Sequence, residues 1–249
     1  MHNDIKFECA SLVVGWYDDA GSVGYGVLNY LKDKLDCRLL AEVEPTGYFP
    51  LNSVLISDDV AQFPESKLYY CPEKELLLFL SYSPSGDWYK FLNTIIDMAS
   101  YHCRLRQIYT LGGMITLNAH TVPRQLSAVS NTVQMKKMIA GNNEVDTGMD
   151  YETSEGQRPT LNSFFLWVAK ERDVPTVSLW IPVPFYLTGV EDPAGWLKIL
   201  ELLDKRFDLG LDFADLDKAI AGQDGKITRA RHDNIGLDEL LNGWRPDRF

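Results

Sequence analysis

The sequence has few cysteines, and none of them lie in a pattern that marks a metal or redox site. The four cysteines are widely spaced and include no CxxC pair, at positions Cys9, Cys37, Cys71 and Cys103. Structural zinc sites and thiol–disulfide active sites both use closely spaced cysteines, so we expect no bound metal and no such redox centre. We expect free thiols at all four positions, as is usual in the reducing cytoplasm.

Long apolar runs and clusters of positive charge are also missing. No apolar stretch approaches the roughly 18 residues that a membrane-spanning helix requires. The first ten residues lack the basic and apolar regions of a secretory signal, so we expect a cytoplasmic protein without a membrane partner. The formal net charge is −11, with no local reversal of sign. We therefore expect no nucleic-acid partner, because phosphate backbones carry the same charge.

Segments with the periodicity of strands and helices make up most of the chain, and residues 11–31 are the first of them. Residues 12–14 are a short apolar run typical of a buried strand, and residues 15–21 form a glycine-containing turn. Residues 22–31 have the apolar spacing of a helix, with Ser22 as its expected N-cap. A strand, a turn and a packed helix form the first half of a βαβ unit.

The same alternation continues along the chain. Further strands are expected at residues 37–43, 54–56, 67–70, 76–81, 107–111, 126–129 and 176–181. Further helices are expected at residues 88–102, 133–140, 160–172 and 213–221, and another begins at Pro193. We expect Gly112 and Gly113 to end one strand, and Pro182 and Pro184 to end the last one.

This order of elements predicts an α/β protein with a largely parallel central sheet and helices on both faces. The 249 residues, 45% of them hydrophobic, are enough for one large core. Apolar density falls after Gly222, and the last amphipathic pattern is at residues 237–244. We expect a core domain over residues 1–205 and a C-terminal helical extension and tail over residues 206–249.

The glycine-containing turn is the first candidate for a binding site. A strand–turn–helix junction presents backbone N–H groups at the carboxyl edge of a sheet, where α/β proteins bind anions. The glycines of this turn match neither GxGxxG nor GxxxxGK[ST], and Asp18 and Asp19 would repel a phosphate. The alternative, which we favour, is that Gly21 allows the turn and the glycines after it let the helix pack closely on the sheet.

His120 is in a loop that we expect at the carboxyl edge of the sheet. It would serve there as a general base or a ligand, or it is an ordinary polar loop residue. Ser85 lies in SPSGD rather than in the GxSxG of a nucleophile elbow, and no histidine spacing resembles a zinc site. We therefore expect no catalytic centre, no metal and no other cofactor.

Carboxylates and aromatic residues gather in the loops at the same expected edge. The carboxylates Asp18, Asp19, Glu152 and Glu155 would suit acid–base chemistry if they converged; otherwise they are solvated loop residues. The aromatic residues of these loops indicate an apolar pocket or an assembly surface, and they are Trp16, Tyr17, Tyr48, Phe49, Phe185 and Tyr186.

Several of these motifs resemble, in order, those of the proteasome assembly chaperone 2 family. The opening LVVGWYDDAGSVG resembles the family's first strand, its turn of glycine, aromatic, aspartate, alanine and glycine, and its first helix. Residues 111–113 with His120 resemble its glycine turn and following histidine. Glu155-Gly156 resembles its glycine loop, and residues 181–186 resemble its proline–tyrosine strand exit.

The resemblance implies a three-layer α/β/α fold related to nucleoside phosphorylases. It also implies a homo-oligomer, with trimers in several bacterial members, and no established catalytic activity. Eukaryotic and archaeal relatives bind the proteasome α-ring through a tail of a hydrophobic residue, tyrosine and any residue. This chain ends in Asp247-Arg248-Phe249, so proteasome docking by that route is not expected. Phe185 replaces a histidine that bacterial members often have before the tyrosine, which alters any pocket there.

Two functional hypotheses follow. The first is a non-enzymatic, cytoplasmic homo-oligomer of this family that acts as an assembly factor or scaffold for an unidentified protein partner. The alternative is a small-molecule-binding protein or enzyme, of hydrolase, phosphorylase or carboxylate–amine ligase type, with a pocket at the carboxyl edge of the sheet. The expected pocket or interface residues are Trp16, Asp18, Asp19, Gly21, Gly112, Gly113, His120, Glu155, Gly156, Pro184 and Tyr186.

Overall fold

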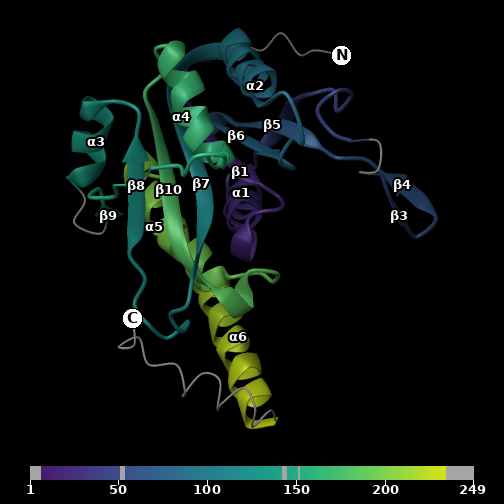
Figure 1. Cartoon of the computed structure of the whole chain (residues 1–249), viewed down its shortest axis with the longest axis vertical. Coiled ribbons are helices and arrows are strands. Elements are labelled where there is room, and N and C mark those ends of the chain that lie inside the picture. Colours follow the sequence, from purple (N-terminus) through teal and green to yellow (C-terminus); the bar gives the residue numbers. More distant parts are fainter. Residues whose placement is uncertain (1–6, 51–53, 142–144, 151, 234–249) are drawn as a thin grey trace. The chain divides into compact units, whose positions relative to one another are not determined.

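The computed structural model describes residues 7–50, 54–141, 145–150 and 152–233 (Figure 1). The chain divides into two compact units, residues 1–211 and residues 212–249. The first unit contains a large sheet with helices on both faces. Within the described residues, the second unit contains the helix α6 (Ala214–Asp233).

An eight-stranded sheet forms the middle layer of the first unit. Its strands are β1 (Phe7–Trp16), β2 (Arg38–Glu42), β5 (Ser66–Cys71), β6 (Leu76–Ser81), β7 (Cys103–Thr116), β8 (Leu126–Ser130), β9 (Val145–Asp146) and β10 (Thr176–Pro184). Their order is β2-β5-β6-β1-β7-β10-β8-β9. The central strands β6, β1, β7 and β10 are parallel, while β2, β5 and β8 have antiparallel neighbours, so the sheet is mixed. The parallel strands bring their carboxyl ends to one edge, where α/β proteins place their sites.

Helices cover both faces of this sheet, which confirms the α/β/α prediction. On one face, α1 (Val23–Lys34) and α5 (Pro193–Phe207) contact each other. On the other face, α2 (Trp88–His102) and α4 (Leu161–Glu171) contact each other (Figure 1). A fifth helix, α3 (Val133–Ala140), packs beside β8.

Side chains supplied by the sequence fix where four of these helices begin. At the starts of α2, α3, α4 and α5, a capping side chain accepts a hydrogen bond from the backbone N–H three residues later; the caps are Asp87, Thr132, Thr160 and Asp192. Pro193 is at the first position of α5, as predicted. Ser22 is at the predicted N-cap position of α1, but its backbone is left-handed, with φ 49°, and its side chain makes no capping bond.

The strand β7 runs further than the sequence predicts. It does not end at Gly112 and Gly113 but continues to Thr116, and both glycines pair with β10. A Cβ at Gly112 would lie 2.6 Å from the Trp180 ring, and one at Gly113 would lie 2.4 Å from the Ala20 carbonyl oxygen. The two glycines therefore mark close approach of neighbouring groups inside a strand, rather than the end of the strand.

The strand β10 also runs past its predicted end. It continues through Pro182 to Pro184 and stays paired with β7 along this length. On its other side, β8 pairs with β10 only as far as Trp180. A strand tolerates proline where no neighbouring strand needs its backbone N–H as a donor. The two prolines therefore extend β10 without the loss of a sheet hydrogen bond.

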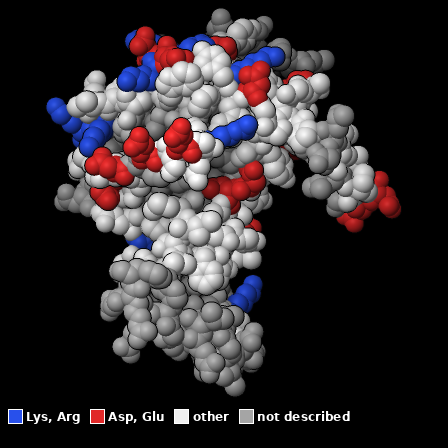
Figure 2. Space-filling model, in the orientation of Figure 1, with Lys and Arg blue, Asp and Glu red and all other residues white. Residues whose placement is uncertain are grey.

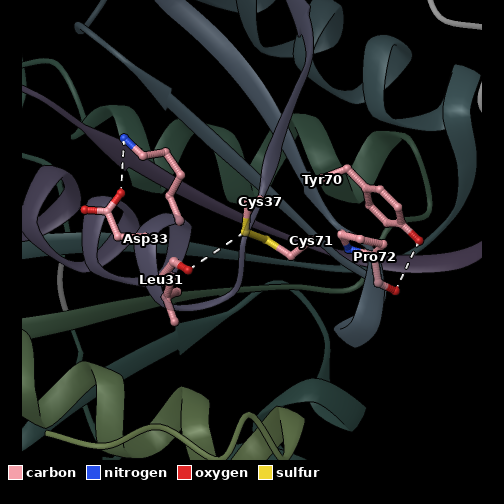
Figure 3. The surroundings of a disulfide bond; sticks show 7 residues. Leu31, Asp33, Cys37, Tyr70, Cys71 and Pro72 are labelled. Atoms are coloured by element: carbon pink, nitrogen blue, oxygen red, sulfur yellow. Dashed lines mark hydrogen bonds and ion pairs between the residues drawn. A yellow bond between two sulfur atoms is a disulfide. The ribbon is translucent and has the colours of Figure 1, made fainter.

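Cys37 and Cys71 are joined in a disulfide (Figure 3), so the prediction of free thiols is wrong for this pair. The two residues are 34 positions apart in the sequence, but the antiparallel strands β2 and β5 bring them opposite each other. Such a pairing is set by tertiary structure, and no spacing rule reveals it. Cys103 is buried and outside any disulfide, and the side chain of Cys9 is not among those described.

Two further elements differ from the prediction. A separate two-stranded sheet consists of β3 (Leu55–Ser57), which was predicted, and β4 (Val60–Gln62), which was not. In the second unit, α6 runs past its predicted end at residue 221 to Asp233. The amphipathic pattern at residues 237–244 and the last three residues lie outside the described chain. None of the described helices is both long and apolar enough to cross a membrane.

Candidate functional site

Trp16 ends β1 at the carboxyl edge, and its side chain is buried. The indole Nε1–H donates a hydrogen bond of 2.7 Å to Asn162 Oδ1 on α4. The Asn162 amide in turn donates to the Leu111 carbonyl on β7, at 2.8 Å. Trp16 therefore ties β1 to α4 and β7 inside the core.

The two aspartates of the turn after β1 accept hydrogen bonds on either side of β1: Asp18 from the segment after β6 and Asp19 from β7. Asp18 Oδ1 accepts hydrogen bonds from the backbone N–H and the hydroxyl of Ser83, at 3.0 and 2.8 Å. Both carboxylate oxygens of Asp19 accept from the backbone N–H of Gly113, each at 3.0 Å. Burial raises the pKa of Asp19 to about 7, although backbone hydrogen bonds, that of Gly113 first, act to lower it.

Gly21 completes this turn and is tied to the segment after β10. Its φ is +67°, which favours glycine. Its N–H donates to the Thr188 carbonyl, and its carbonyl accepts from the Asp192 N–H and the Trp196 indole. The N–H groups of Gly21 and Gly113 are thus bound within the protein, which supports the packing interpretation of this turn over a phosphate site.

His120 and Tyr186 contact each other at the same edge. The Tyr186 hydroxyl oxygen is 2.7 Å from both the backbone N and the Nδ1 of His120. The hydroxyl can accept from the backbone N–H and donate to the ring nitrogen, so it closes the loop after β7 onto the segment after β10. The structure brings these two predicted residues together as a positioning contact.

Arg124 and Asp192 form a buried ion pair that the sequence analysis missed. Their side chains are 8% and 0% exposed. Asp192 also caps α5, and Arg124 donates to the Pro182 carbonyl at 3.4 Å. An aspartate directly before Pro193 is a recognisable capping signal, but the distant arginine had no sequence signal. The pair holds the loop after β7 against the start of α5.

The remaining predicted residues are at the margin of this arrangement or outside it. Pro184 lines a small cavity of about 30 Å³ with Val122 and Arg124. Glu155 and Gly156 are exposed in the loop before α4, where a Cβ at Gly156 would meet nothing within 4 Å. The described contacts therefore join Asp19, Gly113, Gly21 and their neighbours into one packed edge, and Glu155 makes no part of it.

Exposed apolar side chains surround this packed edge. They lie where β7 and β10 end and in the loops that follow, and we call them the apolar edge: Met114, Ile115, Leu117, Val122, Phe185 and Val190. Their exposure ranges from 38% at Met114 to 63% at Ile115. Figure 2 shows charged side chains mainly over the upper helices and largely uncharged surface toward the lower ends of the long strands. Exposed apolar side chains at the ends of two neighbouring strands make this edge a candidate interaction surface.

A second exposed apolar surface lies on the two-stranded sheet. We call β3, β4 and the residues up to Phe63 the hairpin arm. Ile56 is 70% exposed, Val60 is 56% exposed and Phe63 is 61% exposed. The arm pairs with no strand of the large sheet, as Figure 1 shows.

Comparison with known proteins places the chain in a family. The model of the PAC2 family matches residues 12–229. The chain belongs to the PAC2 family. No curated protein matches it.

Solved structures of other proteins share the fold of this chain at low sequence identity. Mycobacterium tuberculosis Rv2714, of unknown function, is 22% identical with a TM-score of 0.77, and the match covers 98% of this chain and 86% of that one. M. tuberculosis Rv2125, a proteasome-assembly chaperone homologue, is 18% identical with a TM-score of 0.72, over 88% and 94% of the chains. Pyrococcus furiosus PbaB, an archaeal proteasome activator, is 18% identical with a TM-score of 0.73, over 93% and 96%.

This PAC2 chain also has a groove away from the predicted site. It measures about 490 Å³ and lies between the segment after β2 and the helix α2. Tyr48 contributes to one wall, where its hydroxyl is 3.1 Å from the Thr94 hydroxyl and Lys90 Nζ is 5.8 Å from its ring centre. Within the described residues, no group of three or more His, Cys, Asp or Glu side chains is arranged to hold a metal ion.

Proposed function

We propose that this PAC2 protein is a non-enzymatic homo-oligomer that acts as an assembly factor or scaffold for another protein. The observation that carries the proposal is the hairpin arm, which exposes Ile56, Val60 and Phe63. The PAC2 family and relatives described as a proteasome-assembly chaperone homologue and a proteasome activator support a chaperone-like role. The partner protein and the cytoplasmic location stay predictions from the sequence.

We infer that another protein surface covers the hairpin arm. A two-stranded hairpin is marginally stable in water, because it has no second layer to bury its apolar side chains. Every residue of β4 is exposed in the single chain. Burial of Ile56 and Phe63 against another subunit would remove apolar surface from water at roughly 25 cal/mol per Å².

The apolar edge of a second copy is the surface that we propose for the arm. The proposed contact joins the apolar side chains of the two surfaces, and the exposed Asp58 and Asp59 in the turn between β3 and β4 stay in solvent. An arm of one copy on the edge of the next is a heterologous contact, which closes into a ring when the rotation fits. A trimer is the ring that the family resemblance predicts.

Paired surface variants test this arrangement. Ile56→Ser with Phe63→Ser removes the arm surface, and Ile115→Ser with Phe185→Ser removes the edge surface. The native chain is expected to elute as a trimer, and each double variant as a monomer, by size-exclusion chromatography with light scattering. An equimolar mixture of the two variants retains one intact arm–edge contact and is expected to form a dimer.

Val133→Ser is the matched control, because Val133 is 71% exposed on α3 and belongs to neither surface. It is expected to leave the oligomer intact. A native chain that elutes as a monomer would overturn the proposal, and an edge variant that stays oligomeric would overturn the ring.

A small-ligand site at the carboxyl edge is the second candidate. It is favoured by the pKa of about 7 that burial gives Asp19, which suits proton exchange at neutral pH. Against it, both Asp19 oxygens accept hydrogen bonds from Gly113. A thermal-shift screen with a metabolite library separates the candidates. A compound that stabilises the native chain, but not Asp19→Asn or Tyr186→Phe, would favour the ligand site.

A further inference from the structure

The Cys37–Cys71 disulfide lies at the edge of the sheet and closes a covalent loop of the chain. Cys37 directly precedes β2, and Cys71 is the last residue of β5. Arg38 pairs with Tyr70, so the two cysteines occupy the next opposing positions of the two strands. Figure 3 shows the bond between the end of α1 and the end of β5. The bond therefore fixes the start of the border strand β2 to β5, its neighbour in the sheet.

The segment enclosed by this bond contains several surfaces described above. It includes β2, the groove wall from Glu42 to Tyr48, and the hairpin arm. The border strand β2 has one buried residue, Leu40, and its Ala41 packs partly buried against the core. Its pairing with β5 also has an irregularity between Leu39 and Ala41. The disulfide is the covalent restraint on this segment, and it acts beside the packing of Tyr48 and Phe49 on Phe91 of α2.

The two sulfur atoms differ in access. Cys71 is 0% exposed, whereas Cys37 is partly exposed. Attack by an external thiolate therefore falls on Cys37 Sγ, and Cys71 is the leaving group. Access thus assigns different roles to the two cysteines.

The surroundings also accommodate the two thiols that reduction would form. Cys37 Sγ lies 3.8 Å from the Leu31 carbonyl oxygen, which would accept a hydrogen bond from a Cys37 thiol. Cys71 would be a small buried thiol beside the core, which proteins tolerate well. Both redox forms are therefore compatible with the fold around them.

We propose that Cys37–Cys71 is a thiol–disulfide exchange site for a dithiol reductant, and that its redox state controls the order of the enclosed segment. One thiolate of the reductant bonds to Cys37 Sγ, and Cys71 leaves as a thiolate and takes up a proton. The second reductant thiolate then attacks the reductant sulfur that is bonded to Cys37, and Cys37 leaves as a thiolate and takes up a proton. Two electrons and two protons pass to the protein, and the reductant becomes a disulfide.

Reduction has a defined structural consequence. It removes the covalent restraint on β2, so the backbone of β2 and the groove wall becomes more mobile, while β1, β7 and α2 keep their packing. The further effect on oligomerisation rests on the proposed function of the hairpin arm. The expected result there is a weaker oligomer, because a loosely anchored arm loses more entropy on docking.

The experiment uses the full chain in buffers poised with reduced and oxidised dithiothreitol. Cys9→Ser and Cys103→Ser are introduced first, so that only the pair can react. Alkylation and mass spectrometry give the oxidised fraction, and hydrogen exchange gives the mobility of residues 38–50. The amides of this segment are expected to exchange about tenfold faster after reduction, whereas those of α2 and β7 stay unchanged.

Two results would overturn the proposal. One is a pair that stays as two thiols in oxidised dithiothreitol, and the other is an exchange pattern that is identical in both forms. Cys37→Ser serves as a permanently open form and is expected to match the reduced native chain. If hydrogen exchange responds while the oligomer size does not, the redox site stands and the role of the arm in assembly fails.

Discussion

Asp19 and Gly113 are joined through both oxygens of a single carboxylate, each 3.0 Å from the same backbone nitrogen. The two residues are 94 positions apart in the sequence, and the bond ties the turn after β1 to the carboxyl-terminal part of β7. Burial raises the pKa of this carboxyl from 3.8 to about 7. The protonation of one side chain is therefore coupled to the packing of the edge.

The contribution of Asp19 to the free energy of unfolding is expected to fall as the pH rises from about 4 to 7. In this window the unfolded chain has released the Asp19 proton and the folded chain still holds it, so raising the pH favours unfolding. Asp19→Asn removes this contribution. The pH slope of its unfolding free energy should differ from that of the native chain by about 1 kcal/mol per pH unit. Urea unfolding at pH 5, 6 and 7 measures both slopes. Equal slopes for the two chains would contradict the raised pKa.

Gly24→Ala is expected to destabilise the protein by about 2–3 kcal/mol, because its new methyl group overpacks the contact between α1 and β1. A Cβ at this position would lie 2.3 Å from the Trp16 backbone nitrogen and 2.8 Å from the Gly15 Cα. Backbone atoms cannot rotate away as a side chain can. Gly86→Ala is the control, since a Cβ there meets nothing within 4 Å, and it should change stability by less than about 0.5 kcal/mol. Urea unfolding compares the two.

Arg124→Met is expected to lower the free energy of unfolding by about 3 kcal/mol, since it leaves the buried Asp192 carboxylate without its partner. Arg106→Met is the matched control. Its ion pair with Glu75 is half exposed, so its loss should cost about 0.5 kcal/mol. Chemical denaturation of both variants gives the difference. Similar losses in the two variants would show that the Arg124 pair gains nothing from burial.

Tyr186→Phe is expected to loosen the loop after β7 without moving the core. The substitution removes the hydroxyl that binds the backbone N–H and Nδ1 of His120, at a cost of about 1–2 kcal/mol. Hydrogen exchange should rise in residues 117–123 and stay unchanged in β1. Tyr89→Phe, on the surface of α2 and 48% exposed, is the control. An unchanged loop in Tyr186→Phe would mean that Arg124 alone holds it.

Local sequence signals predicted the elements whose limits are set locally. The helix predicted over residues 133–140 has those limits, and α5 begins at Pro193 as predicted. The ends of β7 and β10 were missed, because Gly112 and Pro182 have meanings that depend on the neighbouring strands. Strand limits follow pairing, which one sequence segment does not contain.

The candidate site was predicted only in outline. Asp19, His120 and Tyr186 were expected at the carboxyl edge, and the structure gives each a bonded partner there. The partner of Arg124 and the bond between Cys37 and Cys71 were missed. Both join residues that are distant in sequence, so their geometry exists only after the sheet has formed. The three-residue strand β4 is too short and too exposed to give a periodic signal.

The place of β1 in the middle of the sheet has a consequence for biosynthesis. This strand leaves the ribosome before both of its neighbours in the sheet, β6 and β7, so Val13 cannot pair with Tyr109 until about 96 further residues have been made. At about 5–20 residues per second, that delay is on the order of ten seconds. During that time an apolar segment is without its final cover. Chains whose synthesis stops before β7 are therefore expected to be insoluble. They would aggregate rather than form a smaller folded protein.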